Sequence, residues 1–166
     1  GQMPELVKRA FIAAEDRRFY KHDGIDLVGI SRAVVRNITR GSLEEGASTI
    51  TQQTAKSLLG QQSSKSVTRI IEKLKEWIVA IRLESNLTKE EIITHYLNQY
   101  DFLNQAVGIK SAAYVYFNTT PDQLTVEQGA MLIGMLKNSS LFNPIRREEK
   151  VTKRREVVLK QMEKNG

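Results

Sequence analysis

The sequence predicts an all-α domain, and three observations lead to this prediction. No stretch shows a sustained alternation of apolar and polar residues, so strands are not expected. Apolar residues instead recur at helical spacing in several segments of the 166-residue chain. Capping boxes, in which a Thr is followed three residues later by Gln or Glu, mark several helix starts. At this length we expect one domain, residues 1–166.

Two amphipathic helices are predicted near the start of the chain. Residues 4–14 place a set of apolar side chains on one face, namely Leu6, Val7, Ala10, Phe11 and Ala14. Asp26 can accept a hydrogen bond from a free backbone N–H, and so cap a second helix with apolar residues from Leu27 to Ile38. Gly41 is placed to end this helix, because glycine readily adopts the left-handed conformation that follows many helices.

The next two helices lie on either side of a polar segment. Thr49 and Gln52 form the capping box of one helix, which Gly60 can end. The polar residues 61–66 are predicted to be a mobile loop. The clearest helix of the sequence then covers residues 67–83. Its apolar stripe follows an i, i+3/i+4 pattern and consists of Ile70, Ile71, Leu74, Trp77, Ile78 and Ile81.

Further helices are predicted in the second half of the chain. A capping box at residues 88–91 opens one, and residues 104–117 fit another with small side chains that allow close packing. A capping box at residues 125–128 opens the next. The break at Asn143-Pro144 precedes a final amphipathic helix that carries Val151, Val158 and Met162. Aromatic residues predicted to lie in the core are Tyr100, Phe102, Tyr114, Tyr116 and Phe117.

Composition excludes some functions and leaves others open. The 25 Lys and Arg exceed the 19 Asp and Glu, which gives a net charge of +6, and residues 146–166 are the most basic part. This end suits phosphate groups, nucleic acid or anionic lipid, although a solvated helix face explains it equally well. The chain has no Cys, which excludes disulfides and thiol catalysis. His22 and His95 are too few for a His-rich metal site, and we expect His95 to be an exposed helix residue.

Glu15 is a candidate general base at the predicted end of the first helix. A carboxylate at a helix C-terminus opposes the helix dipole, so stability alone does not favour it there. Basic neighbours can tune its ionised form. The alternative is a surface ion pair of Glu15 or Asp16 with Arg17 or Arg18. We expect His22 to form hydrogen bonds near Glu15.

A second cluster is dense in hydroxyl, amide and ammonium groups. It contains Ser48, Thr49, Gln52, Gln53 and Lys56, at a predicted helix N-terminus. Free N–H groups, hydroxyls and a Lys can hold an anion such as a diphosphate. The alternatives are a capped helix that faces solvent and a helix-turn-helix that binds DNA.

The polar face of the helix over residues 67–83 carries Arg69, Glu72, Lys73 and Glu76. Residues three apart meet on a helix surface, so Arg69 with Glu72, and Lys73 with Glu76, can form ion pairs. In the functional interpretation, Glu76 is a second active-site carboxylate flanked by phosphate-binding cations. Two carboxylates that flank a sugar linkage are the usual equipment of glycosidic-bond chemistry.

Five groups of residues, in order along the chain, resemble the motifs of the peptidoglycan glycosyltransferases of family 51. They are Glu15–Asp26, Gly46–Lys56, Lys73–Glu84, Lys89–Phe117 and Glu127–Leu159. These proteins comprise the transglycosylase domains of class A penicillin-binding proteins and the monofunctional glycosyltransferases. The resemblance covers essentially the whole chain.

The resemblance implies a lysozyme-like, two-lobed helical fold whose smaller lobe faces the membrane. It also implies that the protein polymerises lipid II into β-1,4-linked glycan strands and releases undecaprenyl diphosphate. Glu15 falls on the catalytic base and Glu76 on the second carboxylate, which supports the donor side. Substrate binding is implied for Asp16, Ser48, Thr49, Gln52, Gln53, Lys56, Arg69, Lys73 and Asn98.

The resemblance also implies partners and a location. The partners are lipid II, the growing glycan chain, an anionic membrane surface and moenomycin-type inhibitors, and no nucleic acid is expected. A divalent cation, Mg²⁺ or Mn²⁺, is the one cofactor considered, at the diphosphate and without a dedicated protein metal site. The location is the extracytoplasmic face of the bacterial cytoplasmic membrane, with a transmembrane anchor expected upstream of Gly1.

The chain departs from the family pattern in three places. The segment between Lys56 and Glu76 is a few residues longer than is common. Glu72 stands where the family usually has an Arg before the Lys of the third motif, and Arg69 can take over that role from one turn earlier. Residues 99–105 replace a turn that usually contains glycine. Two alternatives to the transferase stay open: a lysozyme-like hydrolase that cleaves glycan with Glu15, and a basic helical DNA-binding domain.

Overall fold

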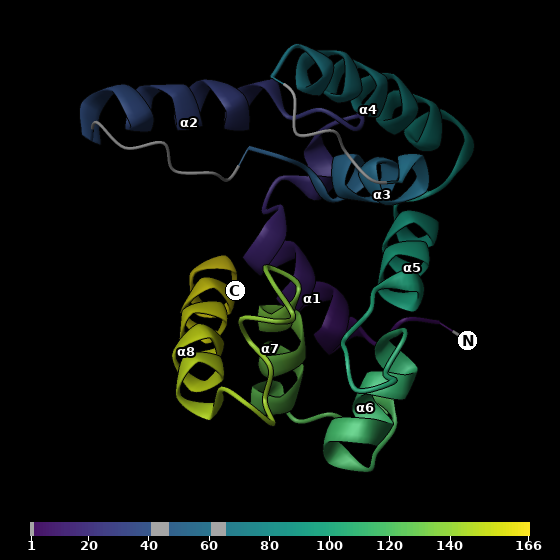
Figure 1. Cartoon of the computed structure of the whole chain (residues 1–166), viewed down its shortest axis with the longest axis vertical. Helices are drawn as coiled ribbons and strands as arrows, with labels where there is room; N and C mark the ends of the chain where they lie inside the picture. The colour runs from purple at the N-terminus through teal and green to yellow at the C-terminus, as the bar shows by residue number, and fades with distance from the viewer. Residues whose placement is uncertain (1, 41–46, 61–65) are drawn as a thin grey trace. The chain divides into compact units, whose positions relative to one another are not determined.

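A computed structural model describes residues 2–40, 47–60 and 66–166. The secondary structure of these residues is helical apart from one isolated bridge between Asp101 and Val107. The α-helices are α1 (Glu5–Glu15), α2 (Leu27–Arg40), α3 (Ile50–Leu59), α4 (Ser66–Asn86), α5 (Lys89–Gln99), α6 (Ile109–Phe117), α7 (Val126–Met135) and α8 (Glu148–Asn165) (Figure 1). Short 3-10 helices cover Phe19–Lys21 and Pro121–Gln123. The all-α, lysozyme-like class predicted from the sequence is confirmed.

The chain forms two compact units, as the two-lobed prediction requires. The first unit combines the residues up to Arg17 with Ile93–Gly166, and the second unit is Arg18–Ile92. In the first unit, α1, α7 and α8 pack side by side (Figure 1). Their fully buried side chains include Val7, Phe11, Leu132, Ile133, Met135 and Val158. In the second unit, α3 packs along α4.

Local signals placed most helix starts correctly. The capping boxes at Thr49 and Thr125 are complete, with both reciprocal hydrogen bonds present. The box at Thr88 is complete as well. Asp26 caps α2 by accepting a hydrogen bond from the backbone N–H of Gly29 at 3.1 Å. Each of these partners lies within a few residues, which explains why the sequence alone revealed them.

Asp26 also fixes the chain in front of α2. Its Oδ1 accepts a hydrogen bond from Nε of Arg18 at 3.2 Å. Burial opposes ionisation of this carboxyl, but the Gly29 N–H and the Arg18 guanidinium together lower the pKa of Asp26. Two predicted boundaries concern the end of α2 and the start of α4. Gly41 and residues 61–65 are outside the described residues, and Ser66, assigned to the loop, is the first residue of α4.

The predicted helix over residues 104–117 is wrong in its first part, because α6 begins only at Ile109. Leu103, Asn104 and Gln105 form a turn in which all three residues have positive φ angles of 62°, 51° and 66°. The Asn104 Nδ2 donates a hydrogen bond to the hydroxyl of Tyr116 at 2.8 Å, and this hydroxyl donates to the Phe102 carbonyl at 2.6 Å. Tertiary contacts therefore hold a turn that helical spacing could not reveal.

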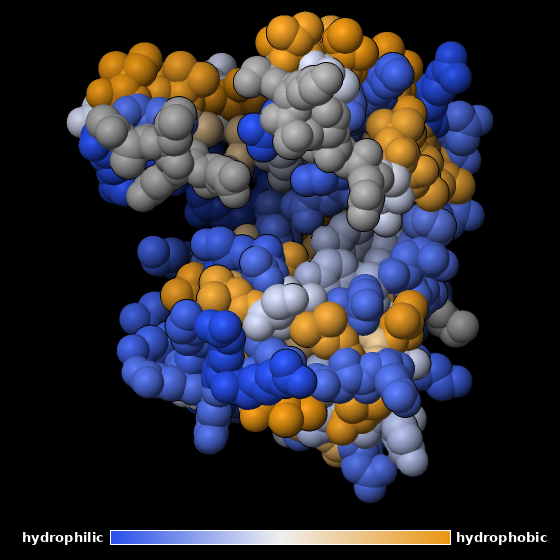
Figure 2. All heavy atoms as spheres, viewed as in Figure 1, coloured by the Kyte–Doolittle hydropathy of each residue, from blue (hydrophilic) through white to orange (hydrophobic). Residues whose placement is uncertain are grey.

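The apolar faces of α2 and α4 are exposed, and they are visible as orange surfaces in Figure 2. The exposed residues of α2 are Leu27, Val28, Val34, Val35 and Ile38. Those of α4 are Val67, Ile70, Ile71, Leu74, Ile78 and Ile81. On the polar face of α4, Glu76 is buried, whereas Arg69 is exposed. In the part of the chain that the structure describes, no helix is long and apolar enough to cross a membrane.

Candidate active site

Glu15 lies at the end of α1 in the first unit, and Arg154 of α8 faces it. The Arg154 Nη2 is 3.7 Å from Oε1 of Glu15, and the two side chains are 11% and 15% exposed. The Arg154 Nε donates a hydrogen bond to the Gly134 carbonyl at 3.2 Å. Burial lowers the pKa of Arg154, while the negative charge of Glu15 acts in the opposite direction. The guanidinium that faces Glu15 thus comes from the far end of the chain, whereas the predicted partner Arg18 pairs with Asp26.

Aromatic residues of the first unit pack next to this part of α1. The rings of Phe11 and Tyr96 are 5.0 Å apart, and those of Tyr96 and Tyr100 stack at 5.9 Å. Burial raises the pKa of both tyrosines, and the charge of Glu15 contributes in the same direction. Both phenols therefore stay protonated at neutral pH and cannot serve as bases. That Glu15 is the proton acceptor stays a prediction.

Lys73 and Glu76 of α4 form the centre of the second unit's polar site. The Lys73 Nζ donates hydrogen bonds to Oε1 of Glu76 at 2.8 Å and to Oγ of Ser48 at 3.1 Å. Glu76 is 2% exposed, but Lys73 is 44% exposed. The buried carboxylate and the Ser48 hydroxyl thus hold the ammonium of a partly exposed lysine side chain. The predicted Lys73–Glu76 pair is confirmed.

The other predicted binding residues divide into buried and exposed ones. The side chains of Thr49 and Gln52 are buried and engaged in the capping box of α3. Asp16 is also buried, at the end of α1. Gln53 is half-buried, and the exposed residues are Lys56, Arg69 and Asn98. Within the second unit, the structure brings together Ser48, Thr49, Lys73 and Glu76.

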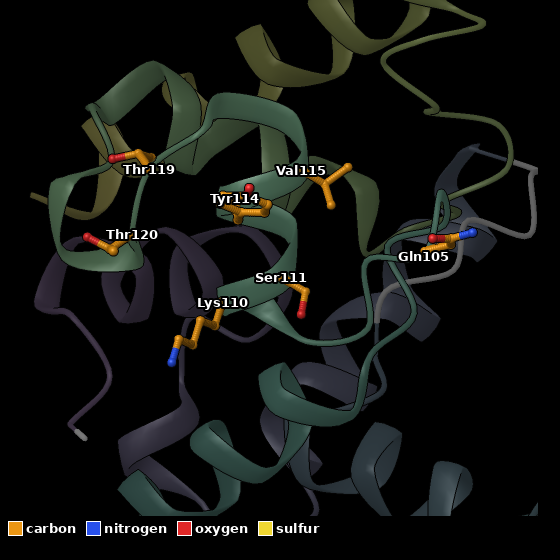
Figure 3. Close-up of a pocket in the computed structure, with 7 residues that line it drawn as sticks. All are labelled: Gln105, Lys110, Ser111, Tyr114, Val115, Thr119 and Thr120. Carbon is orange, nitrogen blue, oxygen red and sulfur yellow. The ribbon is translucent and has the colours of Figure 1, made fainter.

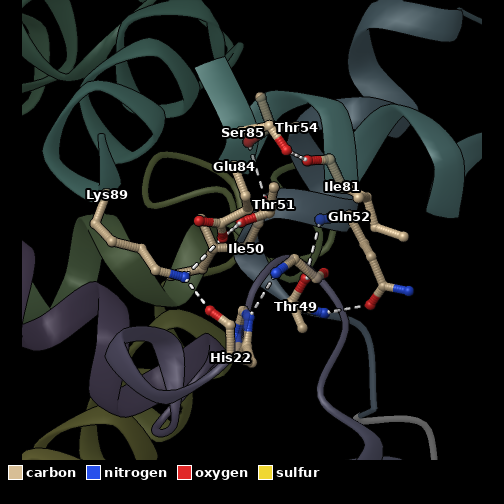
Figure 4. Close-up of polar contacts among 11 residues, drawn as sticks. His22, Thr49, Ile50, Thr51, Gln52, Thr54, Ile81, Glu84, Ser85 and Lys89 are labelled. Atoms are coloured by element: carbon tan, nitrogen blue, oxygen red, sulfur yellow. Dashed lines mark hydrogen bonds and ion pairs between the residues drawn. The ribbon is translucent and has the colours of Figure 1, made fainter. Parts of the chain in front are cut away.

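The sequence predicted that His22 forms hydrogen bonds, but not the polar network with Lys89 and Glu84 to which it belongs (Figure 4). The His22 Nδ1 accepts a hydrogen bond from the Gly24 N–H at 3.0 Å, and its carbonyl accepts one from Lys89 Nζ at 2.6 Å. Lys89 also donates to Glu84 at 2.7 Å. The available signal was the position of Lys89 at the first residue of a helix, where a positive charge opposes the helix dipole. His95, expected to be exposed, is half-buried.

An open cavity of about 540 Å³ lies beside α6 in the first unit (Figure 3). Its lining residues are Gln105, Lys110, Ser111, Tyr114, Val115, Thr119 and Thr120. None of the predicted site residues belongs to it. Tyr114 is exposed, so its assignment to the core was wrong, whereas Phe102 is fully buried as predicted.

The described residues do not build a metal cage on their own. No group of three His, Asp or Glu side chains gathers in the described ranges. The Glu76 carboxylate beside Lys73 is bonded to the Lys73 ammonium. Mg²⁺ is commonly held by one or two carboxylates together with substrate phosphates. A divalent cation at the diphosphate of the substrate stays a prediction.

These groups fit an all-α enzyme domain with a candidate general base in one unit and a candidate anion-binding ammonium in the other. Comparison with known proteins gives the family. The family model described as transglycosylase matches residues 1–163. The chain therefore belongs to the transglycosylase family, and its class of activity is glycosyl transfer.

The relatives of the chain carry the name penicillin-binding protein. Penicillin-binding protein 1A of Neisseria lactamica is 44% identical over 162 residues, which cover 98% of this chain and 20% of the relative. Penicillin-binding protein 1A/1B of Bacillus subtilis is 46% identical over 167 residues, which cover 99% of this chain and 18% of the relative. The chain thus spans about a fifth of the length of these proteins.

Proposed function

We propose that this chain is a peptidoglycan glycosyltransferase domain that joins lipid II into β-1,4-linked glycan strands with inversion at the anomeric carbon. The observation that carries the proposal is Glu15, a mostly buried carboxylate that faces Arg154, in a chain of the transglycosylase family. A positive neighbour favours the ionised form, which is the form a general base needs. Hydrolysis of glycan is the competing chemistry for the same carboxylate.

In the proposed reaction Glu15 accepts the proton from the 4-hydroxyl of the acceptor N-acetylglucosamine. The acceptor oxygen forms a bond to C1 of the donor N-acetylmuramic acid, and the bond from C1 to the diphosphate oxygen breaks. The bonding pair leaves with undecaprenyl diphosphate. Positioned proton transfer of this kind contributes on the order of 10²–10⁴-fold to a rate.

Lys73 is the proposed counter-charge for the leaving diphosphate. Its ammonium is held by Glu76 and Ser48, and its side chain is 44% exposed. A cation that is already in place when negative charge develops lowers the barrier without further reorganisation. A hydrolase has no need for such a diphosphate site, which favours the transferase over the hydrolase. Glu76 acts in this proposal by orienting Lys73.

The exposed apolar faces of α2 and α4 support work at a membrane surface. Contiguous exposed apolar patches commonly mark sites of contact with other molecules or membranes. The proposed donor carries a long lipid, so an enzyme acting on it gains from an apolar face that enters the bilayer interface. The outer face of the cytoplasmic membrane is the proposed location, and the anionic bilayer the proposed surface.

The experiment is a polymerisation assay with lipid II. Glu15→Gln should abolish polymer formation while retaining the helical content and the affinity for lipid II. Glu149→Gln, which alters an exposed carboxylate on α8, is the control and should leave activity unchanged. Near-full activity of the Glu15 variant would refute the assignment of the base. Shortening of preformed glycan by the unaltered chain, without polymer formation, would instead favour the hydrolase.

A further inference from the structure

Lys89 and Glu84 carry charges at the helix ends that favour them least. Lys89 is the first residue of α5, and Glu84 lies in the last turn of α4. A helix dipole disfavours a cation at the N-terminus and an anion at the C-terminus. Yet the two side chains are only 20% and 7% exposed, and Lys89 Nζ is 2.7 Å from Oε1 of Glu84. Helix stability alone would select the opposite charges at these ends.

The ion pair has further partners in the second unit (Figure 4). The Lys89 Nζ donates a hydrogen bond to the His22 carbonyl at 2.6 Å and lies 4.5 Å from the centre of the Phe19 ring. Oε1 of Glu84 accepts a hydrogen bond from the Thr51 hydroxyl at 2.6 Å. The pair therefore connects α4 and α5 to the segment that contains Phe19 and His22, and to α3.

Two sets of contacts lead from this ion pair to the first turn of α3. The direct one is the bond between Glu84 and Thr51. The indirect one passes through His22, whose Nδ1 accepts from the Gly24 N–H, while the Gly24 carbonyl accepts from the Thr49 hydroxyl at 2.6 Å. Thr49 is the N-cap residue of α3. Both routes fix the same end of the same helix.

Gly24 makes the indirect route rigid. It has a φ of 104°, a conformation that residues with a side chain rarely adopt. A Cβ at this position would lie 3.0 Å from the carbonyl oxygen of Ala80 and 3.2 Å from Cγ of Glu84. The turn is therefore packed against α4 without spare room, and a shift of Glu84 or His22 is transmitted to the Thr49 hydroxyl.

The end of α3 that these contacts fix is part of the proposed donor site. Ser48 precedes Thr49 and accepts a hydrogen bond from Lys73. We propose that Lys89 and Glu84 are positioning residues that hold the start of α3 against Lys73, and that they thereby set the affinity for the donor diphosphate. This inference rests on the proposed function for its substrate, but the geometry of the network does not depend on it.

The kinetic test is Lys89→Met in the whole chain with lipid II as substrate. A displaced Ser48 weakens binding of the donor in its ground state, so KM should rise on the order of 10- to 100-fold while kcat changes much less. Lys89→Arg keeps the charge and should restore part of the affinity. Lys153→Met removes the cation of an equally short but exposed pair with Glu149 and should leave KM unchanged.

A double variant separates positioning from a general loss of stability. If Lys89 acts through the start of α3, Ser48→Ala should raise KM in the unaltered chain but add little in the Lys89→Met background. Independent, multiplicative effects of the two changes would overturn the proposal, as would an unchanged KM for Lys89→Met. If Lys89→Met does not fold, Glu84→Gln decides in its place, because it keeps an acceptor for Thr51 and removes only the charge.

Hydrogen exchange of backbone amides tests the positioning without any substrate. In Lys89→Met, amides of residues 49–53 should exchange at least tenfold faster than in the unaltered chain, while those of α8 keep their protection. Unchanged protection of residues 49–53 would overturn the positioning role. If the unaltered chain makes no polymer from lipid II, the proposed function fails, and the exchange result still decides whether Lys89 and Glu84 position α3.

Discussion

The contact between Glu15 and Arg154 leads to a quantitative prediction about stability. The two changes are Glu15→Gln and Arg154→Met, each made alone and both together. The side chains are mostly buried, with Arg154 Nη2 at 3.7 Å from Glu15 Oε1. Each single change leaves one charge in a poorly solvated place, whereas the double change removes both. We therefore expect the losses in free energy of unfolding from the two single changes to add up to more than the loss from the double change.

The size of this effect follows from the distance and the burial. Two unit charges about 4 Å apart attract each other by about 4 kcal/mol at an effective dielectric constant of 20. The loss of hydration opposes this gain, and the lowered pKa of Arg154 is a sign of that cost. We expect a coupling free energy of about 2 kcal/mol, which is in the range found for contacting residues. The Arg154→Met variant also loses the bond from Nε to the Gly134 carbonyl, but this loss is the same with and without Glu15 and cancels in the cycle.

The assay is urea denaturation of the four proteins, followed by far-ultraviolet circular dichroism. The four proteins are compared at neutral pH. A coupling below about 0.5 kcal/mol at neutral pH would refute the argument, because the stability changes of two sites that do not interact are additive to within about this value.

Three further predictions concern the backbone and the surface. Gly24→Ala should lower the free energy of unfolding by about 3 kcal/mol, because the new side chain is strained and overpacks against α4. Gly60 has a φ of 83° but open space around it, so Gly60→Ala should lower this free energy by only about 1 kcal/mol in the same denaturation series. Equal losses would contradict the packing argument. Gln105→Gly should raise the free energy of unfolding by about 0.5 kcal/mol, because relief of the left-handed conformation outweighs the added freedom of the unfolded chain. A lower free energy of unfolding would count against strain at this turn. Ile38→Glu should weaken binding to anionic vesicles at least tenfold in a flotation assay. Ile145→Glu changes an exposed apolar residue of the other unit and should leave this binding unchanged. Equal losses of binding would show that α2 does not contact the membrane in the way proposed.

The helix starts could be predicted because their causes are local. Thr49 and Thr125 find their partners three residues away, and both capping boxes are present. The turn at residues 103–105 could not be predicted in the same way. It combines local hydrogen bonds, such as that from the Leu103 N–H to Asp101 Oδ1, with the contact of Asn104 to the Tyr116 hydroxyl in the next helix. Its residues are not the glycines that usually mark positive φ angles.

The sequence suggested candidate site residues and one contact between them, but not their contacts with distant segments. Glu15, Lys73 and Glu76 could be selected from their motifs, and the Lys73–Glu76 pair from helical spacing. The guanidinium that faces Glu15 belongs to α8, at the opposite end of the chain, and no local pattern connects the two residues. The same holds for Lys89 and its bond to the His22 carbonyl. Contacts between distant segments depend on packing, which a periodicity does not specify.

Helix α4 shows why periodicity and burial must be kept apart. Its spacing correctly separates an apolar face from a polar one, and the usual inference places the apolar face inside. The structure places Glu76 inside and leaves Ile70, Leu74 and Ile78 exposed. Burying a carboxylate costs free energy unless it is paired, and here Lys73 supplies the pair. An arrangement that exposes apolar side chains and buries a charge is unfavourable for an isolated domain in water. It becomes favourable when the apolar face enters a lipid surface and the ammonium on the polar face meets an anion, which are the two surroundings that a lipid-linked diphosphate donor provides.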